Sequence, residues 1–344
     1  MIKLLTILWL SVGITACNKK KLPAPILVEP PISTPVTFAK GADVSWLTQM
    51  EAQGIQFYNA NGTAQECMAL LQSQGINTIR LRVWVNPATT YNNTADVLAK
   101  ALRAKALGMR IMINFHYSDT WADPGSQTKP AAWAALNLTD LKAALYNHTT
   151  SVLTTLKSNG ITPEWVQVGN ETNDGMLWPT GKASTNMSNF AQLFNSGYDA
   201  VKSILPTTKV ILHLSNGYDA ALYNWMLTGL ANNNTKYDVI GLSLYPTPTN
   251  WPTLNTQCFA NMSTLATQYN KEVMVVEVGM GWIYSTECKA FITDLIAKTK
   301  QVPNAKGIGV LYWEPQAYNN WQGYSLGAFN NDGKPSIAIT AFNN

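Results

Sequence analysis

The chain has 344 residues, longer than most single domains, yet one α/β barrel of about 250 residues or more would use nearly all of it. Only 13% of the residues are charged, against about a quarter in ordinary domains, while 12 Trp and 14 Tyr supply flat apolar faces. Four of the 24 basic residues and one of the 20 acidic residues precede Phe38, so the remainder carries a formal charge of +1. Such a domain has no overall attraction to nucleic acid or to acidic polymers, and no nucleic-acid partner is expected.

The first 17 residues resemble a bacterial export signal. Lys3 provides a positive start and an apolar stretch, too short to span a bilayer, runs from Leu4 to Ile14. Its end, I-T-A-C, resembles the lipobox of bacterial lipoproteins, which implies that Cys17 is lipidated and becomes the mature N-terminus. We therefore expect an exported protein anchored to a membrane, at the cell surface or in the periplasm. A plain secretory signal with an incidental cysteine is the alternative.

Residues 18–37 have the composition of a tether. They contain Lys19, Lys20, Lys21 and several prolines, which favour a semi-stiff chain that holds a domain away from a membrane. From Phe38 onward no second stretch of this composition appears, so the sequence predicts one folded domain over residues 38–344.

Apolar strands alternate with helices throughout this domain. Strands are predicted at residues 40–44, 78–85, 110–115, 165–169, 210–214, 239–244, 273–278 and 307–312. Helices with 3.6-residue apolar spacing are predicted between them, for example at 64–74, 95–107, 138–158 and 190–205. Gly75, Gly108 and Gly160 stand where helix C-terminal caps are expected. The eight alternations predict a single (β/α)8 TIM barrel; an open doubly wound sheet is the alternative, but no glycine-rich phosphate-binding motif follows the first strand.

Three cysteines follow Cys17 in the sequence. An exported domain could pair two of them, and Cys258 and Cys288 are the closer couple, whereas Cys67 is expected to be a buried free thiol. No Cys/His cluster has the spacing of zinc ligands, so we expect neither a metal nor another cofactor.

Polar and aromatic residues follow nearly every predicted strand. At the C-terminal ends of barrel strands such residues line the mouth of the pocket, although any single one can be an ordinary capping or rim residue. The candidates are Asp43, Trp46, Arg80, Arg82, Trp84, His116, Asp119, Asn170, Glu171, His213, Asn216, Tyr245, Glu277, Trp313 and Glu314.

Two of these candidates, Glu171 and Glu277, suggest a reaction. Each closes a short apolar, β-branched stretch, as at the C-terminal end of a buried parallel strand. Following the fourth and seventh strands of a closed barrel, they would face each other across the pocket. Hydrolysing a glycoside needs one protonated carboxyl to assist the leaving oxygen and one ionised carboxyl to attack or to activate water. The pair therefore predicts a glycoside hydrolase.

Several segments carry a family resemblance. They are F-A-K-G-A-D-V-S-W, N-T-I-R-L-R-V-W-V-N-P, F-H-Y-S-D-T-W-A-D-P-G with the later K-P-A-A-W, W-V-Q-V-G-N-E-T-N, H-L-S-N-G, G-L-S-L-Y-P, V-V-E-V-G and L-Y-W-E-P. With them the chain, from about Phe38 to its C-terminus, resembles glycoside hydrolases of clan A and, within them, family 53, the endo-β-1,4-galactanases that cut the galactan side chains of pectin. The runs R-x-R-x-W-x-N-P and H-Y-S-D-x-W-A-D-P are specific to this family, whereas N-E with a distant E-x-G occurs across the clan.

The resemblance implies roles for the strand-end residues. Glu171 would be the acid/base and Glu277 the nucleophile of a retaining double displacement, with their carboxyls roughly 5–5.5 Å apart. Asn170 would bind the sugar 2-hydroxyl, Arg80 would keep Glu277 ionised, and Tyr245 would donate a hydrogen bond to Glu277. The implied partners are a β-1,4-galactan chain and, through the lipid anchor, a membrane, with the protein itself a monomer.

Tryptophan and histidine residues are predicted to make further sugar contacts. Indole packs on the C–H face of galactose, so the candidate platforms are Trp84, Trp121, Trp178, Trp251, Trp282, Trp313 and Trp321, and the resemblance puts Trp313 at the cleavage point. Trp165, inside a strand, is expected to be core. His116 and His213, at strand ends, are predicted to contact sugar hydroxyls, and His148, inside a helix, to lie on the surface.

Two segments depart from the family pattern. Leu244 stands where a further tyrosine is usual, and E-V-G-M-G-W replaces E-T-G-Y-P-W, which puts the shape of the sugar subsites in question but not the catalytic residues. Some bacterial relatives carry calcium on a loop late in the barrel, but no acidic cluster dense enough for such a site appears here. The alternative functions are another clan A endo-glycanase, acting on mannan or xylan, and a non-catalytic glycan-binding lipoprotein, which the presence of both glutamates disfavours.

Overall fold

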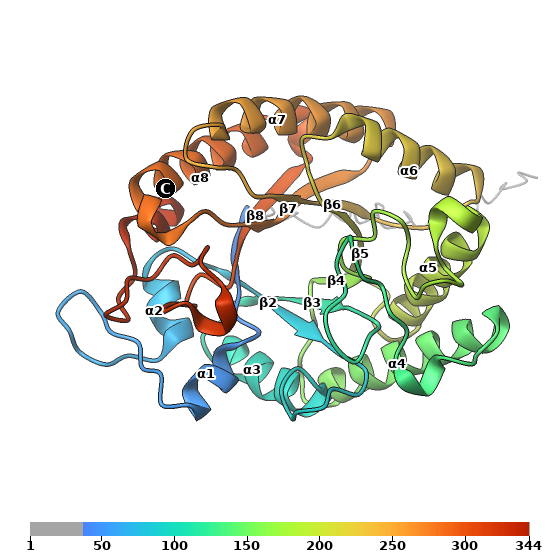
Figure 1. The fold of residues 1–344 in the computed structure, drawn as a ribbon, viewed down its shortest axis with the longest axis horizontal. Helices are drawn as coiled ribbons and strands as arrows, with labels where there is room; N and C mark the ends of the chain where they lie inside the picture. Colours follow the sequence, from blue (N-terminus) through green and yellow to red (C-terminus); the bar gives the residue numbers. More distant parts are fainter. Residues whose placement is uncertain (1–36, 344) are drawn as a thin grey trace, which may run out of the picture. The chain divides into compact units, whose positions relative to one another are not determined.

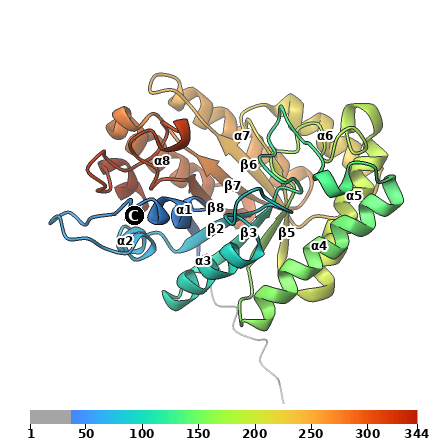
Figure 2. The same cartoon turned by 60° about the horizontal axis from the view of Figure 1, so that its bottom comes forward.

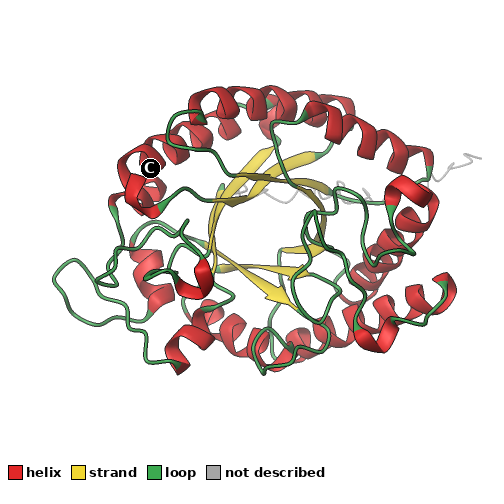
Figure 3. Cartoon of the chain, viewed as in Figure 1, coloured by secondary structure: helices red, strands yellow, loops and turns green. Residues whose placement is uncertain are grey.

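The computed structural model describes residues 37–343, so the predicted export signal, Cys17 and the predicted tether up to residue 36 lie outside the described residues. Eight parallel strands hydrogen-bond in chain order and close into a barrel, the first strand pairing with the last. Figure 1 looks into this barrel, and Figure 3 shows the ring of strands inside a ring of helices. The predicted (β/α)8 barrel is confirmed.

The eight strands are short and almost entirely buried. Their bounds are β1 Ala39–Asp43, β2 Thr78–Val83, β3 Arg110–Phe115, β4 Trp165–Val168, β5 Lys209–Leu214, β6 Val239–Leu244, β7 Glu272–Val278 and β8 Gly307–Trp313. The ends predicted from the sequence lie within two residues of these bounds. Because all strands are parallel, their C-terminal ends meet at one end of the barrel, and the candidate site residues follow there.

Helices cover the outside of the barrel (Figure 2). Their bounds are α1 Leu47–Ala52, α2 Cys67–Ser73, α3 Thr94–Ala106, α4 Leu138–Ser158, α5 Ala183–Ile204, α6 Ala220–Asn232, α7 Trp251–Gln268 and α8 Ser285–Lys300. Short 3-10 helices lie at Ala131–Trp133, Trp282–Tyr284, Pro303–Ala305, Trp321–Gly323 and Ile337–Asn343. Within the described part of the chain, no helix has both the length and the apolar character needed to cross a membrane.

Local signals explain several of the helix ends. Asn93 and Asn137 cap α3 and α4, because each side-chain oxygen accepts a hydrogen bond at 3.0 Å from the backbone amide three residues later. Gly75, Gly108 and Gly160 follow α2, α3 and α4 with φ of +87°, +67° and +70°, as predicted for C-terminal caps. α5 begins at residue 183, earlier than predicted, because an extra first turn precedes a backbone kink.

The inside of the barrel has an apolar floor and a polar layer above it. The floor consists of Ala39, Met112, Trp165, Ile211, Val239, Met274, Val276, Ile308 and Leu311. Trp165 is fully buried there, which confirms the expectation that it is core. Alternate residues of a strand face the same side, so the residues two positions beyond the floor on β3, β4 and β5 enter the layer above. These are Asn114, Gln167 and His213, all fully buried.

An irregularity in β7 directs Glu277 into the barrel mouth. Leu242 of β6 pairs with Val275, but the next residue, Ser243, pairs with Glu277, so β7 contains one extra residue at this point. Val276 therefore belongs to the apolar floor while Glu277, directly after it, contacts the polar layer. In a regular strand these neighbours would face opposite sides.

Two expectations about single residues differ from the structure. Cys67 is a buried free thiol as expected, but Cys258 and Cys288 are also free and buried, so the pair that the sequence allowed is not formed. His148 is half-buried rather than on the surface, because its face of α4 packs against Trp133. Burial lowers the pKa of His148 to about 4.

Gly307, the first residue of β8, should be sensitive to substitution. A Cβ atom there would overlap the backbone carbonyl oxygen of Thr299 in α8, which cannot rotate away. We expect Gly307→Ala to displace β8 and to lower the free energy of unfolding by about 1–3 kcal/mol, measured by urea denaturation. Gly125→Ala is the matched control, because its Cβ would meet only the Asp123 side chain, at 3.4 Å. Equal losses of stability in the two variants would contradict this explanation.

Candidate active site

Glu171 and Glu277 line one cavity at the C-terminal end of the barrel. Glu171 is the third residue after β4, and Glu277 lies near the end of β7. The cavity has a volume of about 190 Å³ and is lined by His116, Trp121, Ala122, Asp123, Asn170, Glu171, Tyr245, Glu277 and Trp313. Glu277 is buried and Glu171 is half-buried. The fold therefore brings together the two carboxyls that the sequence singled out.

Arg80 holds Glu277 through a buried ion pair. Its Nη2 lies 2.7 Å from Glu277 Oε1, and its Nη1 lies 2.8 Å from Asp43 Oδ2. Burial lowers the pKa of Arg80, but the carboxylates of Glu277 and Asp43 outweigh this effect and raise it. The Tyr245 hydroxyl donates a hydrogen bond to the other oxygen of Glu277, Oε2, at 2.9 Å. Both oxygens of the Glu277 carboxylate are thus held in place, one by a guanidinium and one by a phenol.

Asn170 and Glu171 lie on a tightly held turn after β4. Glu171 has a φ of +42°, in the left-handed region that residues with side chains rarely adopt. Its N–H donates a hydrogen bond to His213 Nδ1 at 3.2 Å, and Asn170 Oδ1 accepts one from Arg80 Nη2 at 3.1 Å. These contacts fix the directions in which both side chains leave the backbone.

The two carboxyls differ in their electrostatic surroundings. Burial and the negative charge of Glu277 raise the pKa of Glu171 to about 8. Burial also raises the pKa of Glu277, but the Arg80 guanidinium and the Tyr245 hydroxyl act in the opposite direction. Arg80 forms its ion pairs with Glu277 and Asp43, not with Glu171. A single proton on the pair is therefore held by Glu171, which leaves one acid beside one anionic carboxylate.

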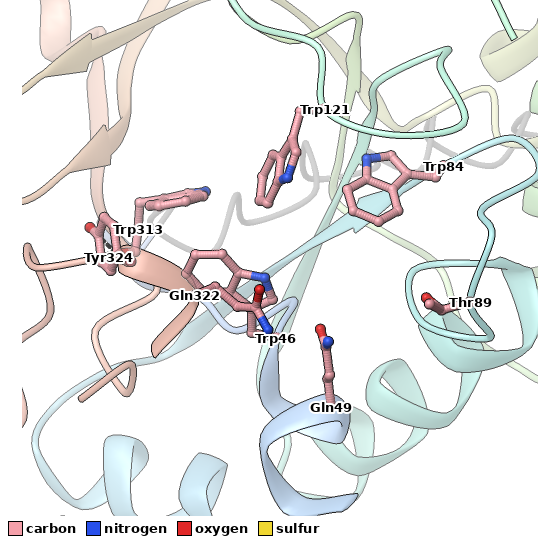
Figure 4. A pocket seen from close by; sticks show the side chains of 9 residues that line it. Trp46, Gln49, Trp84, Thr89, Trp121, Trp313, Gln322 and Tyr324 are labelled. Carbon is pink, nitrogen blue, oxygen red and sulfur yellow. Dashed lines mark hydrogen bonds between the residues drawn. The ribbon is translucent and has the colours of Figure 1, made fainter. Parts of the chain in front are cut away.

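A larger hollow adjoins this cavity. Its volume is about 430 Å³, and Trp121 and Trp313 belong to the linings of both. Figure 4 shows its aromatic side chains, which we call the aromatic wall: Trp46, Trp84, Trp121, Trp313 and Tyr324. Neighbouring rings meet edge to face, with Trp84 5.4 Å and Trp46 5.7 Å from Trp121. Amide and hydroxyl side chains at the edge, those of Gln49, Thr89 and Gln322, add polar groups to this apolar surface.

Arg82 lies beneath the aromatic wall. The central carbon of its guanidinium is 4.1 Å from the ring centroid of Trp121 and 5.0 Å from that of Trp84. Its Nη1 lies 3.5 Å from Glu314 Oε1, and the Glu314 carboxylate also accepts a hydrogen bond from the backbone of Trp46 at 3.1 Å. Burial lowers the pKa of Arg82 and raises that of Glu314 to about 8. The guanidinium makes no hydrogen bond to any described residue, so the indole faces and Glu314 hold it.

The two predicted histidine contacts have different surroundings. His116 lines the cavity, and its Nδ1 accepts a hydrogen bond from the Ala122 amide at 3.1 Å, so its Nε2 can donate into the site. His213 is fully buried and both ring nitrogens are engaged by protein groups, so it lies beneath the cavity and does not reach a sugar hydroxyl. His116 is the first residue after β3, whereas His213 is the last residue but one of β5 and so lies inside the strand.

Asp119 and Asn216, which were also predicted to line the pocket, lie in loops outside the linings of the cavity and the hollow. Asp119 accepts hydrogen bonds from the backbone amides of Asn86 and Ala131, at 3.0 and 2.9 Å, and so joins two loops. Asn216 is exposed on a turn after β5 with φ of +50°, outside the linings of the cavity and the hollow. Both match the capping and rim alternatives left open by the sequence.

Three of the seven predicted tryptophan platforms line the hollow. These are Trp84, Trp121 and Trp313. Of the others, Trp321 belongs to the core and Trp251 packs against it, while Trp178 is half-buried and Trp282 is exposed. The other four tryptophans therefore lie outside the linings of the cavity and the hollow.

Several residues at the site were not expected from the sequence. Gln167 and Asn114 each donate a hydrogen bond to Asn170 Oδ1, and Ser243 of β6 is hydrogen-bonded to His213. The signal that could have found them is the two-residue alternation along each strand above the apolar floor. The family departure at Leu244 has no direct effect on the cavity, because this side chain is buried.

The acidic side chains at the cavity are not arranged as a set of metal ligands. Asp43 is engaged by Arg80, and Asp123 at the cavity edge accepts a hydrogen bond from the Gly125 amide at 2.8 Å. Among residues 37–343, no group of three or more His, Cys, Asp or Glu side chains is placed to hold a metal ion.

Comparison with known proteins identifies the family of this chain. Residues 39–342 match the model described as Glycosyl hydrolase family 53. An arabinogalactan endo-beta-1,4-galactanase of Thermothelomyces thermophilus is 36% identical over 304 residues, which cover 82% of this chain and 90% of that protein. A structure from a study of two fungal beta-1,4-galactanases matches with a TM-score of 0.83 and 33% identity, covering 89% of this chain and 98% of the other. The GH53 catalytic domain of Ignisphaera aggregans matches with a TM-score of 0.80 and 29% identity, covering 92% and 99%.

Replacing Glu277 by glutamine should lower the pKa of Glu171. After burial, the charge of Glu277 is the largest influence that raises this pKa to about 8, so its removal should release the Glu171 proton at lower pH. The midpoint can be followed by ¹³C NMR of protein labelled at glutamate carboxyls, with the Glu171 signal assigned by Glu171→Gln. Glu164→Gln is the control, because Glu164 pairs with Arg110 at the N-terminal end of the strands. An unchanged midpoint in Glu277→Gln would show that the two carboxyls do not interact.

Proposed function

The chain belongs to glycosyl hydrolase family 53, and on that premise we propose that it is an endo-acting, retaining hydrolase of β-1,4-galactosidic bonds in the galactan and arabinogalactan side chains of pectin. A relative that covers most of its length is named an arabinogalactan endo-beta-1,4-galactanase. The observation in this chain that carries the proposal is the unequal carboxyl pair. Glu277 is held by Arg80 and Tyr245, while Glu171 has a pKa raised to about 8.

In the first step, Glu277 attacks the anomeric carbon of a galactosyl unit. A bond forms between this carbon and a carboxylate oxygen as the glycosidic bond breaks, and Glu171 gives its proton to the departing oxygen. The products are a galactosyl ester of Glu277 and a shortened chain with a free hydroxyl group. Arg80 supports this step because its positive charge keeps Glu277 anionic in a buried position.

In the second step, the ionised Glu171 takes a proton from water. The water oxygen attacks the anomeric carbon from the side that the first leaving group occupied, and the Glu277 carboxylate departs. Two displacements at one carbon retain the β configuration. Glu171 is protonated again at the end, and the enzyme returns to its starting state.

Asn170 is the proposed contact for the sugar 2-hydroxyl. It lines the cavity beside Glu171, and its Oδ1 is occupied by Arg80. One Nδ2 hydrogen is donated to the Ala122 carbonyl at 2.8 Å, which leaves the other for the sugar. A hydrogen bond to this hydroxyl strengthens as positive charge develops on the sugar ring.

The aromatic wall is the proposed binding surface for further galactose units. Trp313 belongs to both linings, so a galactose stacked on it would lie beside the carboxyls, with the next units over the hollow. Such a surface suits a neutral polysaccharide, which agrees with the low net charge of the domain. A continuous surface beyond the cleavage point also favours endo action, because an internal stretch of chain can bind there.

The two alternative functions have less support. An endo-glycanase for mannan or xylan would share the barrel and the carboxyl pair, but relatives above 30% identity include arabinogalactan endo-beta-1,4-galactanases. A non-catalytic glycan-binding protein would not need an acid and an anion held in one cavity.

We expect the enzyme to cut linear β-1,4-galactan into galactooligosaccharides of several lengths. ¹H NMR during the first minutes should detect the β anomer at the new reducing ends before mutarotation, as retention requires. Linear mannan and xylan serve as comparison substrates. Cleavage of either of these with galactan left intact would favour the alternative endo-glycanase.

Glu277→Ala assigns the observed cleavage to this site. Without the nucleophile no covalent intermediate forms, and the rate should fall on the order of 10⁴-fold or more. Glu164→Gln, which alters a carboxyl on the opposite end of the barrel, should retain the rate of the unchanged enzyme. If Glu277→Ala cleaves galactan as fast as the control, the proposed nucleophile is wrong.

We further propose that the protein is exported, lipidated at Cys17, and carried as a monomer on a tether of residues 18–37. The I-T-A-C motif and the proline-rich composition support this part of the proposal. In cells labelled with a palmitate analogue, the full chain should be labelled and sediment with membranes, and Cys17→Ser should lose both properties. Membrane sedimentation of Cys17→Ser at the level of the unchanged chain would refute the anchor.

A further inference from the structure

A chain of buried hydrogen bonds runs beneath the carboxyl pair. It begins at Gln167 on β4, continues to His213 on β5 and ends at Ser243 on β6, three neighbouring strands of the barrel. Gln167 Nε2 lies 2.7 Å from His213 Nδ1, and His213 Nε2 lies 2.7 Å from Ser243 Oγ. The steps of the proposed reaction described above use none of these three side chains.

Arg80 determines which way the Gln167 amide points. Its Nε and Nη2 donate hydrogen bonds to Gln167 Oε1 at 3.3 and 3.2 Å. A guanidinium can only donate, so the atom that faces it must be the amide oxygen. Nε2 of Gln167 is therefore the atom that faces His213, and it also donates to Asn114 Oδ1 at 2.8 Å.

The same contacts determine where His213 carries its proton. Its Nδ1 receives two donors, the Gln167 amide and the backbone N–H of Glu171 at 3.2 Å, so Nδ1 must be unprotonated. Burial, together with the charge of Arg80, lowers the pKa of His213 well below its usual range, so the ring is neutral. The single ring proton is on Nε2, which donates it to Ser243 Oγ.

Ser243 then has its own hydroxyl proton free to donate. Its oxygen accepts from His213, the ring that also accepts the backbone N–H of Glu171, so the serine lies beside this residue, and its hydroxyl lowers the pKa of the Glu171 carboxyl. Its position opposite Glu277 in the strand pairing keeps it beside the carboxyl pair. We propose that Ser243 is a positioning residue for the acid/base, which donates a hydrogen bond to the Glu171 carboxylate in a direction set by Arg80 through Gln167 and His213. This inference deepens the proposed function, on which it rests for the role of Glu171.

Several groups besides Ser243 influence the pKa of Glu171. Those facing it are Glu277 on β7, Arg80 on β2, Asp123 in the loop after β3, Tyr245 after β6, and the neutral rings of His116 and His213. Burial, Glu277 and Asp123 raise the pKa of Glu171, whereas Ser243 and Arg80 lower it. A hydroxyl donor stabilises the carboxylate, which is the form that must accept a proton from water in the second step.

Removing the Ser243 hydroxyl should raise the pKa of Glu171. We expect Ser243→Ala to move the Glu171 midpoint upward by about 0.5–1 pH unit, the size expected for one lost hydrogen bond to a carboxylate. ¹³C NMR of glutamate-labelled protein measures this midpoint without substrate. In the pH profile of kcat/KM on galactan, the alkaline limb should move upward by the same amount, because protonated Glu171 survives to higher pH.

Two matched variants distinguish the hydroxyl from general packing effects. Ser243→Thr keeps the hydroxyl and should keep the midpoint of the unchanged protein. Ser215→Ala removes a nearby serine hydroxyl that is bonded to Asn173 instead of Glu171, and should leave the midpoint unchanged. ¹⁵N NMR should find His213 as the neutral Nε2–H tautomer from about pH 5 to 9.

The role proposed for Ser243 and the proposed galactanase function fail through different measurements. An unchanged or lowered midpoint in Ser243→Ala, an equal rise in Ser243→Thr, or a proton on Nδ1 of His213 would each overturn the inference. Because the NMR titration needs no substrate, it remains decisive even if galactan is not cleaved, a result that would refute the proposed function alone.

Discussion

One buried positive charge, that of Arg80, organises the site. A guanidinium wholly inside a barrel is strongly unfavourable unless it is paired, and Arg80 is paired with Asp43 of β1 and Glu277 of β7. Its remaining hydrogen bonds go to Gln167 and Asn170, in and after β4. Through this one side chain, β2 is connected to β1, β4 and β7. Losing Arg80 would leave two buried carboxylates without their counter-charge, so the arrangement needed for reaction also stabilises the barrel interior.

β2 carries a second buried guanidinium with a different task. Arg82 meets indole faces and Glu314, so it supports the aromatic wall from behind, while Arg80 supports a carboxylate. A wall held in this way needs little rearrangement when a sugar chain stacks on it, which limits the loss of side-chain entropy on binding. Arg80 and Arg82 are two positions apart, so both face the inside of the barrel. One strand therefore supplies the charge that balances Glu277 at the cavity and the side chain that supports the aromatic wall at the hollow.

The barrel and the carboxyl pair were predictable because both depend on local patterns. Apolar strands, capping residues and glutamates at strand ends can be read without knowing how the chain closes. The role of His213 was not predictable, because its depth below the cavity depends on how strands are staggered around the barrel. Pairing of Cys258 with Cys288 could not be judged from sequence distance either, since it depends on helix packing. The direction of Glu277 follows from an irregularity in β7 that no pattern of apolar residues reveals.

The extra residue in β7 makes strand length the variable to which Glu277 is most sensitive. Inserting one codon between Val276 and Glu277 would move the carboxyl one position beyond Ser243 and turn it away from the barrel axis, towards the surrounding helices. A point substitution in the floor would alter packing only by degrees, whereas such an insertion would remove the reaction in one step. Loops at the same end of the barrel can gain or lose residues without this effect. Variation in this chain should therefore be tolerated as insertions in loops and as exchanges in strands, but not as a residue added to β7 before Glu277.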